Sequence, residues 1–169
     1  MLPNATMSMS AAGVRGLKNR ESFRARPYDD HNSFDKNHQP IDWHPGKPLI
    51  GKLTVGYGRV IPISAYEKYK NITEVQATQM LIEDLRPREN AIRLHVLVPL
   101  TQNEYDALVI FIYNIGEGAF LTSTLLKMLN KGDKQGAADQ FMRWIYSNGK
   151  PILVTRRQYE RTIFIRGKY

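Results

Sequence analysis

The sequence predicts an α+β fold in which a small strand-bearing part is followed by a larger helical part. Residues 28–51 are rich in Pro, Gly, Asn, Asp and His, which indicates turns and loops, and they lead into a β-rich run at residues 53–61. After that run, apolar residues recur at helical spacing almost to the C-terminus. Strands gathered in one part of a chain and helices in another are typical of α+β proteins.

A short amphipathic helix is predicted ahead of the strands, at residues 10–24. Ala11, Val14 and Leu17 fall on one face of it at helical spacing. Pro27 and the turn-forming residues behind it close the segment.

Two capping boxes mark where helices start in the second part. Thr73 and Gln76 have the spacing of such a box and open a helix, which we expect Pro87 to interrupt or kink. Thr101 and Glu104 open another helix in the same way.

The helix that begins near Thr101 is expected to lie at the centre of the core, because residues 108–113 are apolar on all sides. Gly116 ends it. We expect further helices at residues 122–131, 135–144 and 154–164. The aromatic residues predicted to pack in the core are Phe111, Phe120, Phe141 and Trp144.

A chain of 169 residues with 42% hydrophobic and 24% charged residues has the size and composition of one globular domain. We expect that domain to span residues 1–169. Its parts are an N-terminal helix at about residues 10–26, a β lobe with a long loop at about residues 28–64, and a helical lobe at about residues 65–169.

The chain has no cysteine, which excludes disulfides, cysteine zinc sites and thiol nucleophiles. Its first ten residues have neither a charged leader nor a sustained apolar run, so we expect no signal peptide or anchor. The longest strongly apolar run, residues 107–113, is far shorter than the roughly 20 residues that a membrane helix needs.

The net charge of +8 is concentrated at the two ends of the chain. Residues 1–26 carry five basic residues and one acid, and residues 141–169 carry seven and one, whereas the stretch between them carries twelve and fourteen. Such asymmetry favours an anionic partner such as nucleic acid, an acidic lipid surface or a wall polymer, with improved solubility as the alternative.

Glu21 and Asp30 are candidate catalytic carboxylates. Glu21 lies four residues after Leu17, at the end of the first helix, where burial and the helix dipole should raise its pKa while the neighbouring arginines lower it. Asp30 lies in a polar turn that should keep it ionised. Two carboxylates in unlike environments suit glycosidic bond hydrolysis. Glu21 as a solvated residue paired with Arg20 or Arg24 is the alternative.

From about Gly13 to Phe164 the chain resembles the phage-type lysozymes, or endolysins. The motifs that carry the likeness appear in the family's order: ESFRARPYDD (residues 21–30), LTVGYG (53–58), PLTQNEYDALV (99–109), YNIGEGAF (113–120), TSTLL (122–126), GD (132–133), AADQFMRW (137–144) and RRQYER (156–161). The resemblance implies a lysozyme-like α+β fold with a saccharide cleft between two lobes. It also implies hydrolysis of the β-1,4 bond between N-acetylmuramic acid and N-acetylglucosamine in peptidoglycan, with inversion.

By the same likeness, Glu21 is the general acid, Asp30 the second carboxylate, and Thr54 holds the attacking water. Substrate binding would fall to Gly56, Tyr57, Gly58, Tyr113 and Asn114. From the residues alone, Gly56 and Gly58 also fit a bulge or tight hairpin, and Asn114 equally fits a helix C-cap. No metal or other cofactor is implied.

Three features depart from the family pattern. The 24 positions from Asp30 to Thr54 exceed the spacing in the shortest members, so residues 31–52 form an inserted loop that we expect to line the cleft or shape substrate access. Arg59 stands where many members have His, and Ser22 replaces a common Gly.

Two other functions stay open. The loop histidines His31, His38 and His44 raise the possibility of a zinc-dependent peptidoglycan amidase, although their spacing matches no compact zinc signature. The second open function is a basic module that binds the envelope or nucleic acid, although no nucleic-acid motif is visible.

As an endolysin, the protein would be a monomer in the host cytoplasm until a holin releases it to the cell wall in the periplasm. Peptidoglycan would be its substrate. We expect the basic C-terminal helix, with Arg156, Arg157 and Arg161, to contact the anionic outer envelope.

Overall fold

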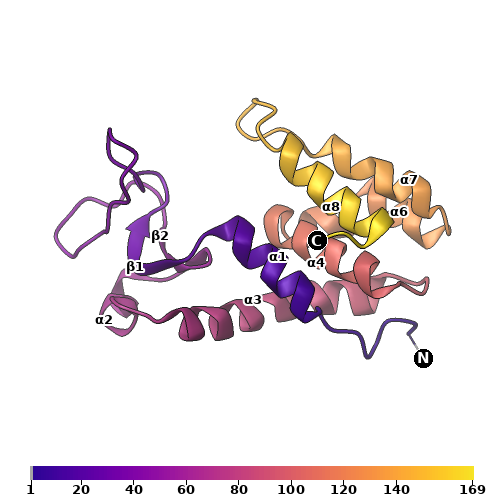
Figure 1. Cartoon of the computed structure of the whole chain (residues 1–169), viewed down its shortest axis with the longest axis horizontal. Coiled ribbons are helices and arrows are strands. Elements are labelled where there is room, and N and C mark those ends of the chain that lie inside the picture. The colour runs from indigo at the N-terminus through magenta and orange to yellow at the C-terminus, as the bar shows by residue number, and fades with distance from the viewer. Residues whose placement is uncertain (1) are drawn as a thin grey trace. The chain divides into compact units, whose positions relative to one another are not determined.

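The computed structural model describes residues 2–169, which form two compact units. The sheet unit comprises residues 18–84, and the helical unit comprises residues 2–17 and 85–169. Helices α1 (Ala11–Glu21) and α3 (Glu74–His95) each contribute residues to both units (Figure 1). The structure therefore has the α+β architecture that the sequence predicts. Among the described residues, no helix has the length and apolar character needed to span a bilayer.

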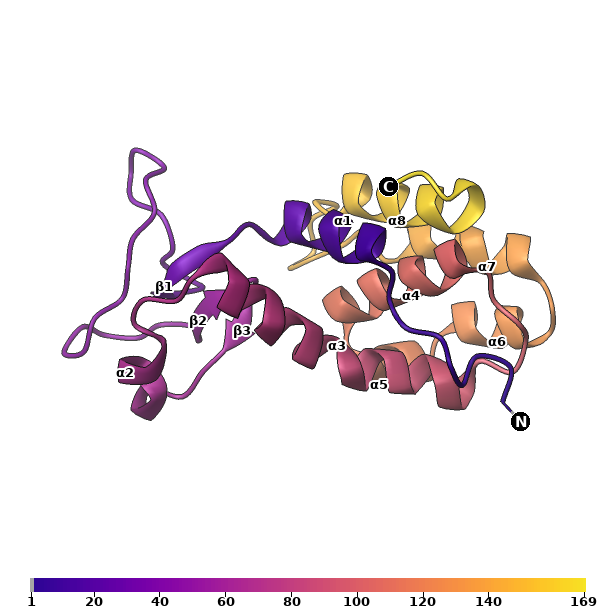
Figure 2. The same ribbon diagram turned by 60° about the horizontal axis from the view of Figure 1, so that its bottom comes forward.

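The sheet unit is built on three antiparallel strands in the order β1 (Arg24–Asp29), β2 (Leu53–Gly56), β3 (Arg59–Val60) (Figure 2). All four residues of β2 are buried, as is usual for a central strand. The register pairs Thr54 with Tyr28 on one side and with Val60 on the other. Thr54 is therefore held between two neighbouring backbones.

The predicted capping box at Thr73 is confirmed. The Thr73 amide donates to Gln76 Oε1 at 2.8 Å, and the Gln76 amide donates to Thr73 Oγ1 at 3.2 Å. These two bonds satisfy amides that α3 itself cannot pair. Between the sheet and α3 the chain forms η1 (Ile63–Ala65) and α2 (Tyr66–Tyr69).

Helix α1 buries a face that shares only Leu17 with the predicted one. Gly13, Gly16 and Leu17 are buried, whereas Ala11 is exposed and Val14 half-buried. An added Cβ on Gly13 would lie 2.9 Å from the Asp106 carboxylate carbon. The glycines allow neighbouring side chains to approach the helix backbone, which an apolar periodicity does not reveal.

The helical unit is organised around α4 (Gln102–Ile115), whose residues from Glu104 to Ile112 are all buried. The central position expected for this helix is confirmed. Phe111 packs edge-on against Phe141 with ring centroids 4.8 Å apart. The other elements of the unit are α5 (Glu117–Leu121), α6 (Thr124–Asn130), α7 (Lys134–Gln140), η2 (Phe141–Arg143) and α8 (Val154–Arg166).

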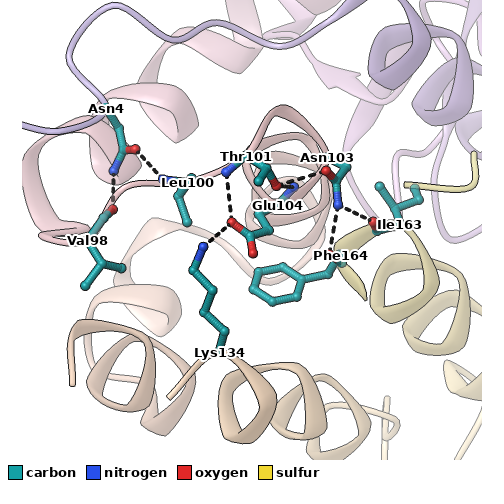
Figure 3. A network of polar contacts seen from close by, with 9 residues as sticks. All are labelled: Asn4, Val98, Leu100, Thr101, Asn103, Glu104, Lys134, Ile163 and Phe164. Atoms are coloured by element: carbon teal, nitrogen blue, oxygen red, sulfur yellow. Dashed lines mark hydrogen bonds and ion pairs between the residues drawn. The ribbon is translucent and has the colours of Figure 1, made fainter. Parts of the chain in front are cut away.

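The start of α4 is tied to several neighbours (Figure 3). The Thr101 amide donates to Glu104 Oε2 at 2.8 Å, and the Glu104 amide donates to Thr101 Oγ1 at 3.4 Å, which confirms the second predicted capping box. Lys134 pairs with the same Glu104 oxygen at 2.7 Å. Asn103 donates to the last carbonyls of α8, at Ile163 and Phe164. The cap thus also holds α7 and α8.

Of the two expectations for Pro87, interruption of the helix is wrong, because α3 continues through this proline, and a kink stays a prediction. Proline removes one helical hydrogen bond and crowds the preceding turn. Leu85 and Ile92, on either side of it, are buried at 2% and 0% exposure. Their burial offsets the local cost of the proline.

Candidate active site

Glu21 is the last residue of α1, and its side chain is half-buried. The next residue, Ser22, has a left-handed backbone with φ of 53°, and β1 begins two residues later. The predicted helix therefore ends earlier than residue 24. A left-handed residue after a helix is usually glycine, which explains why the family often has Gly where this chain has Ser22. This turn fixes where the Glu21 carboxylate leaves the helix.

Asp30 and Thr54 are held by the backbone of one residue, Lys52. The Asp30 amide donates to the Lys52 carbonyl at 3.1 Å, and the Thr54 hydroxyl donates to the same oxygen at 3.2 Å. In return, the Lys52 amide donates to Asp30 Oδ1 at 2.7 Å. Asp30 is exposed, whereas Thr54 is only 4% exposed. The strand pairing thus brings two of the predicted site residues together.

Tyr28 links these residues to Glu21. Its position in the register is opposite Thr54. Burial raises the pKa of the Tyr28 hydroxyl, the positive charge of Arg24 lowers it, and the negative charges of Asp30 and Glu21 raise it further. The net effect is a raised pKa. All these residues belong to the sheet unit.

Gly56 is the last residue of β2, and Tyr57 and Gly58 form the connection to β3. Gly56 and Gly58 have φ of 68° and 98°, so the tight-hairpin interpretation is confirmed. Gly56 is buried, with its Cα facing Ala77, and Gly58 is exposed. Tyr57 as a whole residue is 4% exposed, and its hydroxyl donates to Glu74 at 2.8 Å. Tyr57 is thus packed inside the sheet unit, and Gly58 is the exposed residue of this connection.

Tyr113 and Asn114 lie in the last turn of α4, in the helical unit. The C-cap of this helix is Gly116, so the C-cap interpretation of Asn114 is wrong. Asn114 is exposed and its Oδ1 accepts a hydrogen bond from Arg157. The Arg88 guanidinium lies over the Tyr113 ring, 5.5 Å from its centroid. Both residues therefore take part in charged contacts at one end of the core helix.

Arg157 is not on the surface, contrary to expectation. The sequence places it on a surface face of the C-terminal helix, but it is fully buried and pairs with Glu160 at 3.0 Å. Its guanidinium also lies 5.0 Å from the centroid of the Phe111 ring. Arg156 pairs with Glu160, and Arg161 with Asp139. An amphipathic pattern does not reveal such internal ion pairs, because the partner acids come from other turns and helices.

An open pocket of about 600 Å³ lies in the helical unit and is lined by Thr124, Gln140, Arg143 and Trp144. The sequence places Trp144 in the core, but the residue is half-buried and its ring packs edge-on against Phe111, 5.7 Å away. The indole thus belongs partly to the core and partly to the pocket wall. The apolar spacing of the sequence does not indicate that Trp144 is partly exposed.

The inserted loop, residues 31–52, is folded against β1. The Trp43 amide donates to the Pro27 carbonyl at 2.8 Å, and the Trp43 ring, 5% exposed, packs edge-on against Tyr66. The loop therefore covers part of the edge of β1 that is not paired with β2. Among the described side chains, no group of three or more His, Cys, Asp and Glu residues has the arrangement of a metal site.

Arg24 organises this loop, and sequence reasoning did not single it out. Its guanidinium donates to the carbonyls of Ser33 and Ile41 at 3.3 and 2.9 Å, and it pairs with Asp42 at 3.6 Å. It also lies over the Tyr28 ring, 4.4 Å from the centroid. The basic composition of the segment gave no sign of these contacts, because the carbonyl acceptors lie up to 17 positions away.

Arg59 has a clear partner where the family often has His. It forms hydrogen bonds to both oxygens of Asp84, at 3.1 and 3.0 Å, and to the Met80 carbonyl at 2.6 Å. A planar guanidinium suits such a two-oxygen contact. The substitution therefore ties β3 to α3 within the sheet unit.

Comparison with known proteins gives a consistent result. Residues 18–160 match the phage lysozyme family. The endolysin of Salmonella phage P22 is 37% identical over 160 residues, covering 94% of this chain and 99% of that protein. A crystal structure of a P22 lysozyme mutant superposes with a TM-score of 0.77 at 34% identity, covering 95% and 99% of the two chains. The muramidase domain of SpmX from Asticaccaulis excentricus superposes with a TM-score of 0.72 at 32% identity, covering 94% and 97%.

The match to P22 lysozyme covers the small antiparallel sheet and the helical unit built around one buried helix, and it places this fold in the lysozyme class of glycoside hydrolases. Within that class, the chain belongs to the phage lysozyme family. It is an endolysin, a muramidase that hydrolyses peptidoglycan in the bacterial cell wall.

Proposed function

We propose that Glu21 is the general acid of this muramidase, that Asp30 is its ionised partner, and that the Thr54 hydroxyl helps to hold the attacking water. The observation that carries the proposal is the shared anchoring of Asp30 and Thr54 on the Lys52 backbone. The combined influence of Glu21 and Asp30 on Tyr28 supports it. The three groups thus come from the end of α1, the residue after β1, and β2.

Each group has one task in the reaction. The protonated Glu21 carboxyl donates its proton to the glycosidic oxygen as the bond to the leaving sugar breaks. The Asp30 carboxylate takes a proton from the attacking water as the new carbon–oxygen bond forms, and its negative charge stabilises the positive charge on the sugar ring. Thr54 can offer oxygen lone pairs to that water, because its own hydrogen is directed at Lys52. Attack by water opposite the leaving group inverts the anomeric carbon.

Replacement of Glu21 tests this assignment directly. We expect Glu21→Gln to lower kcat by about 100- to 10,000-fold, because the amide has nearly the same shape but no proton to donate. Asp30→Asn should be similarly severe, and Thr54→Ala should lower kcat without unfolding the protein. The measurement is the rate at which muramic-acid reducing ends appear in digested peptidoglycan, followed by mass spectrometry.

The same digest distinguishes a muramidase from an amidase. An amidase would release free stem peptides and leave the glycan chains intact, whereas a muramidase creates new reducing ends. Wild-type activity in folded Glu21→Gln would contradict the acid assignment. Neither the family match nor the described side chains favour the zinc amidase or the non-catalytic binding module.

The substrate contacts proposed for the glycan are the backbone from Gly56 to Gly58 and the pair Tyr113 and Asn114. Gly58 is exposed, Tyr113 is half-buried and Asn114 is exposed, so each offers surface to a ligand. The Asn114 amide nitrogen can donate to an N-acetyl carbonyl while its oxygen stays on Arg157.

The protein's route to its substrate follows from the endolysin assignment. We propose that the monomer accumulates in the host cytoplasm, that a holin releases it, and that it acts on the wall in the periplasm. Contact with the anionic envelope would fall to the basic residues of the C-terminal segment that are exposed, Arg143, Lys150, Arg166 and Lys168, because Arg157 is buried.

A further inference from the structure

Asp29, the neighbour of Asp30, has a buried carboxylate that accepts three backbone hydrogen bonds. The donors are the amides of His31 at 3.0 Å, Ile50 at 2.6 Å and Gly51 at 2.9 Å. The residue is only 4% exposed. Charge-assisted bonds of this kind are stronger than neutral ones, and burial makes them costly to break.

These three amides belong to the two ends of the inserted loop. His31 is its first residue, and Ile50 and Gly51 lie just before the loop enters β2. One carboxylate therefore closes the loop at its base. The residue that follows Gly51 is Lys52, whose amide and carbonyl hold Asp30 and Thr54.

At the base of the loop, both carboxylates lie close to Gly51. An added Cβ on Gly51 would lie 2.0 Å from Asp30 Oδ1 and 2.9 Å from Asp29 Oδ1. Both side chains are thus in contact with the bare Cα of Gly51. A displacement of Gly51 would move the Lys52 amide and, with it, the carboxylate that this amide holds.

The position of Asp30 matters because an inverting site must keep a water between its two carboxyl groups, which are usually about 6.5–9.5 Å apart. A misplacement of about 1 Å in such a site can cost about 100-fold in rate. A long loop attached directly to the catalytic residue would allow such a displacement unless its ends were fixed.

We infer that Asp29 is a positioning residue for Asp30: by binding the amides of His31, Ile50 and Gly51 it fixes the base of the inserted loop and thereby the Lys52 backbone that holds Asp30. The inference rests on the catalytic role proposed for Asp30. It assigns to the loop base a part in the reaction, separate from any contact that the loop tip makes with substrate.

Asp29→Asn tests the inference, because the side chain keeps its size but must place an NH2 group against one of the donating amides. We expect kcat on solubilised peptidoglycan to fall about 10- to 100-fold while KM stays within about twofold. Rates are measured at a temperature where circular dichroism shows the variant to be folded. A residue with only a structural role would lower the melting temperature and leave kcat unchanged under those conditions.

Asp35→Asn is the matched control. Asp35 Oδ1 also accepts two loop amides, those of Asn37 and Gln39, both at 2.8 Å, but these bonds lie within the first part of the loop, and Asp35 contacts neither Asp30 nor Lys52 in any hydrogen bond described. Its variant should keep kcat within about twofold of the wild type. If Asp29→Asn does not fold, Asp29→Ser takes its place. Serine is smaller and can still accept a hydrogen bond from one amide, and we expect the same fall in kcat.

A wild-type kcat in a folded Asp29 variant, or an equal loss in Asp35→Asn, would overturn the inference. Failure of both Asp29 variants to fold would also overturn it, in favour of a structural role. Asp30→Asn is assayed in parallel. If it retained wild-type activity, the proposed function itself would fail, whereas an inactive Asp30→Asn beside a fully active Asp29→Asn would defeat the positioning role alone.

Discussion

Ser22 shows how one residue connects the end of a helix to the start of a strand. Its left-handed φ of 53° lets the chain leave α1 directly after Glu21. A non-glycine residue pays a steric cost of about 1–2 kcal/mol in this region of backbone space, because its Cβ approaches the carbonyl oxygen.

We therefore expect Ser22→Gly to raise the free energy of unfolding by about 0.5–1 kcal/mol, after subtracting the extra freedom that glycine has in the unfolded chain. Thermal unfolding followed by circular dichroism measures the effect. Asn19→Gly, at an exposed position inside the same helix, is the control and should lower stability by up to about 1 kcal/mol. A lower melting temperature for Ser22→Gly would show that the serine side chain contributes more than its backbone costs.

At the residue scale, the motif spacing selected Glu21, Asp30 and Thr54, but not the residues that support them. Arg24, Asp29 and Gly51 act through backbone groups as many as 22 positions away. No local pattern marks a carboxylate that will bind amides across a loop.

At the element scale, Thr101 and Glu104 define the start of α4, the helix around which the helical unit is built. The Thr101 hydroxyl accepts a hydrogen bond from the Glu104 amide, which has no backbone partner within the helix. Because this start is also tied to α7 and α8 through Lys134 and Asn103, its loss affects more than one helix (Figure 3).

Thr101→Ala should lower the free energy of unfolding by about 1 kcal/mol and the melting temperature by roughly 2–4 °C. Thr122→Ala serves as the control: Thr122 is exposed and its hydroxyl donates to the carbonyls of Gly118 and Ala119, so no helix amide loses an acceptor. Equal losses in the two variants would argue against a specific contribution from the cap. Activity of both variants should stay near that of the wild type.

For the whole molecule, the basic charge is distributed differently from what the sequence order implies. The seven basic residues at the C-terminal end include Arg156, Arg157 and Arg161, each paired with an acid. The surface charge available to an anionic partner is therefore smaller than the count of +6 for this segment suggests. Pairing of this kind also makes the stability of the protein depend on pH.

The pKa of Asp29 predicts the direction in which stability changes with pH. Burial raises the pKa of its carboxyl, but the three amides lower it more, so that the folded-state pKa lies below the ordinary 3.8. A depressed pKa adds stability that is fully present above the unfolded-state value and is lost as the pH falls through the folded-state value. The contribution of Asp29 should thus disappear on acidification from about pH 5 to about pH 2.

We expect the melting temperatures of the wild type and of Asp29→Asn to differ most near neutral pH and to converge toward pH 2. Thermal unfolding in a series of buffers measures this. The lowered pKa values of Glu74, beside Tyr57 and Lys18, and of Asp139, beside Arg161, give both proteins a remaining dependence of the same sign. Parallel curves over the whole range would show that Asp29 is not ionised in the fold.

The sequence by itself determined the fold class, the two capping boxes, the central helix and the three candidate catalytic residues, because each depends on local spacing or on a family motif. Only the tertiary structure decided that α3 passes through Pro87, that Arg157 is buried, and that Asp29 and Arg24 hold the inserted loop. These features depend on which distant groups meet, and the free energy of burying or pairing them outweighs the local preference of each residue.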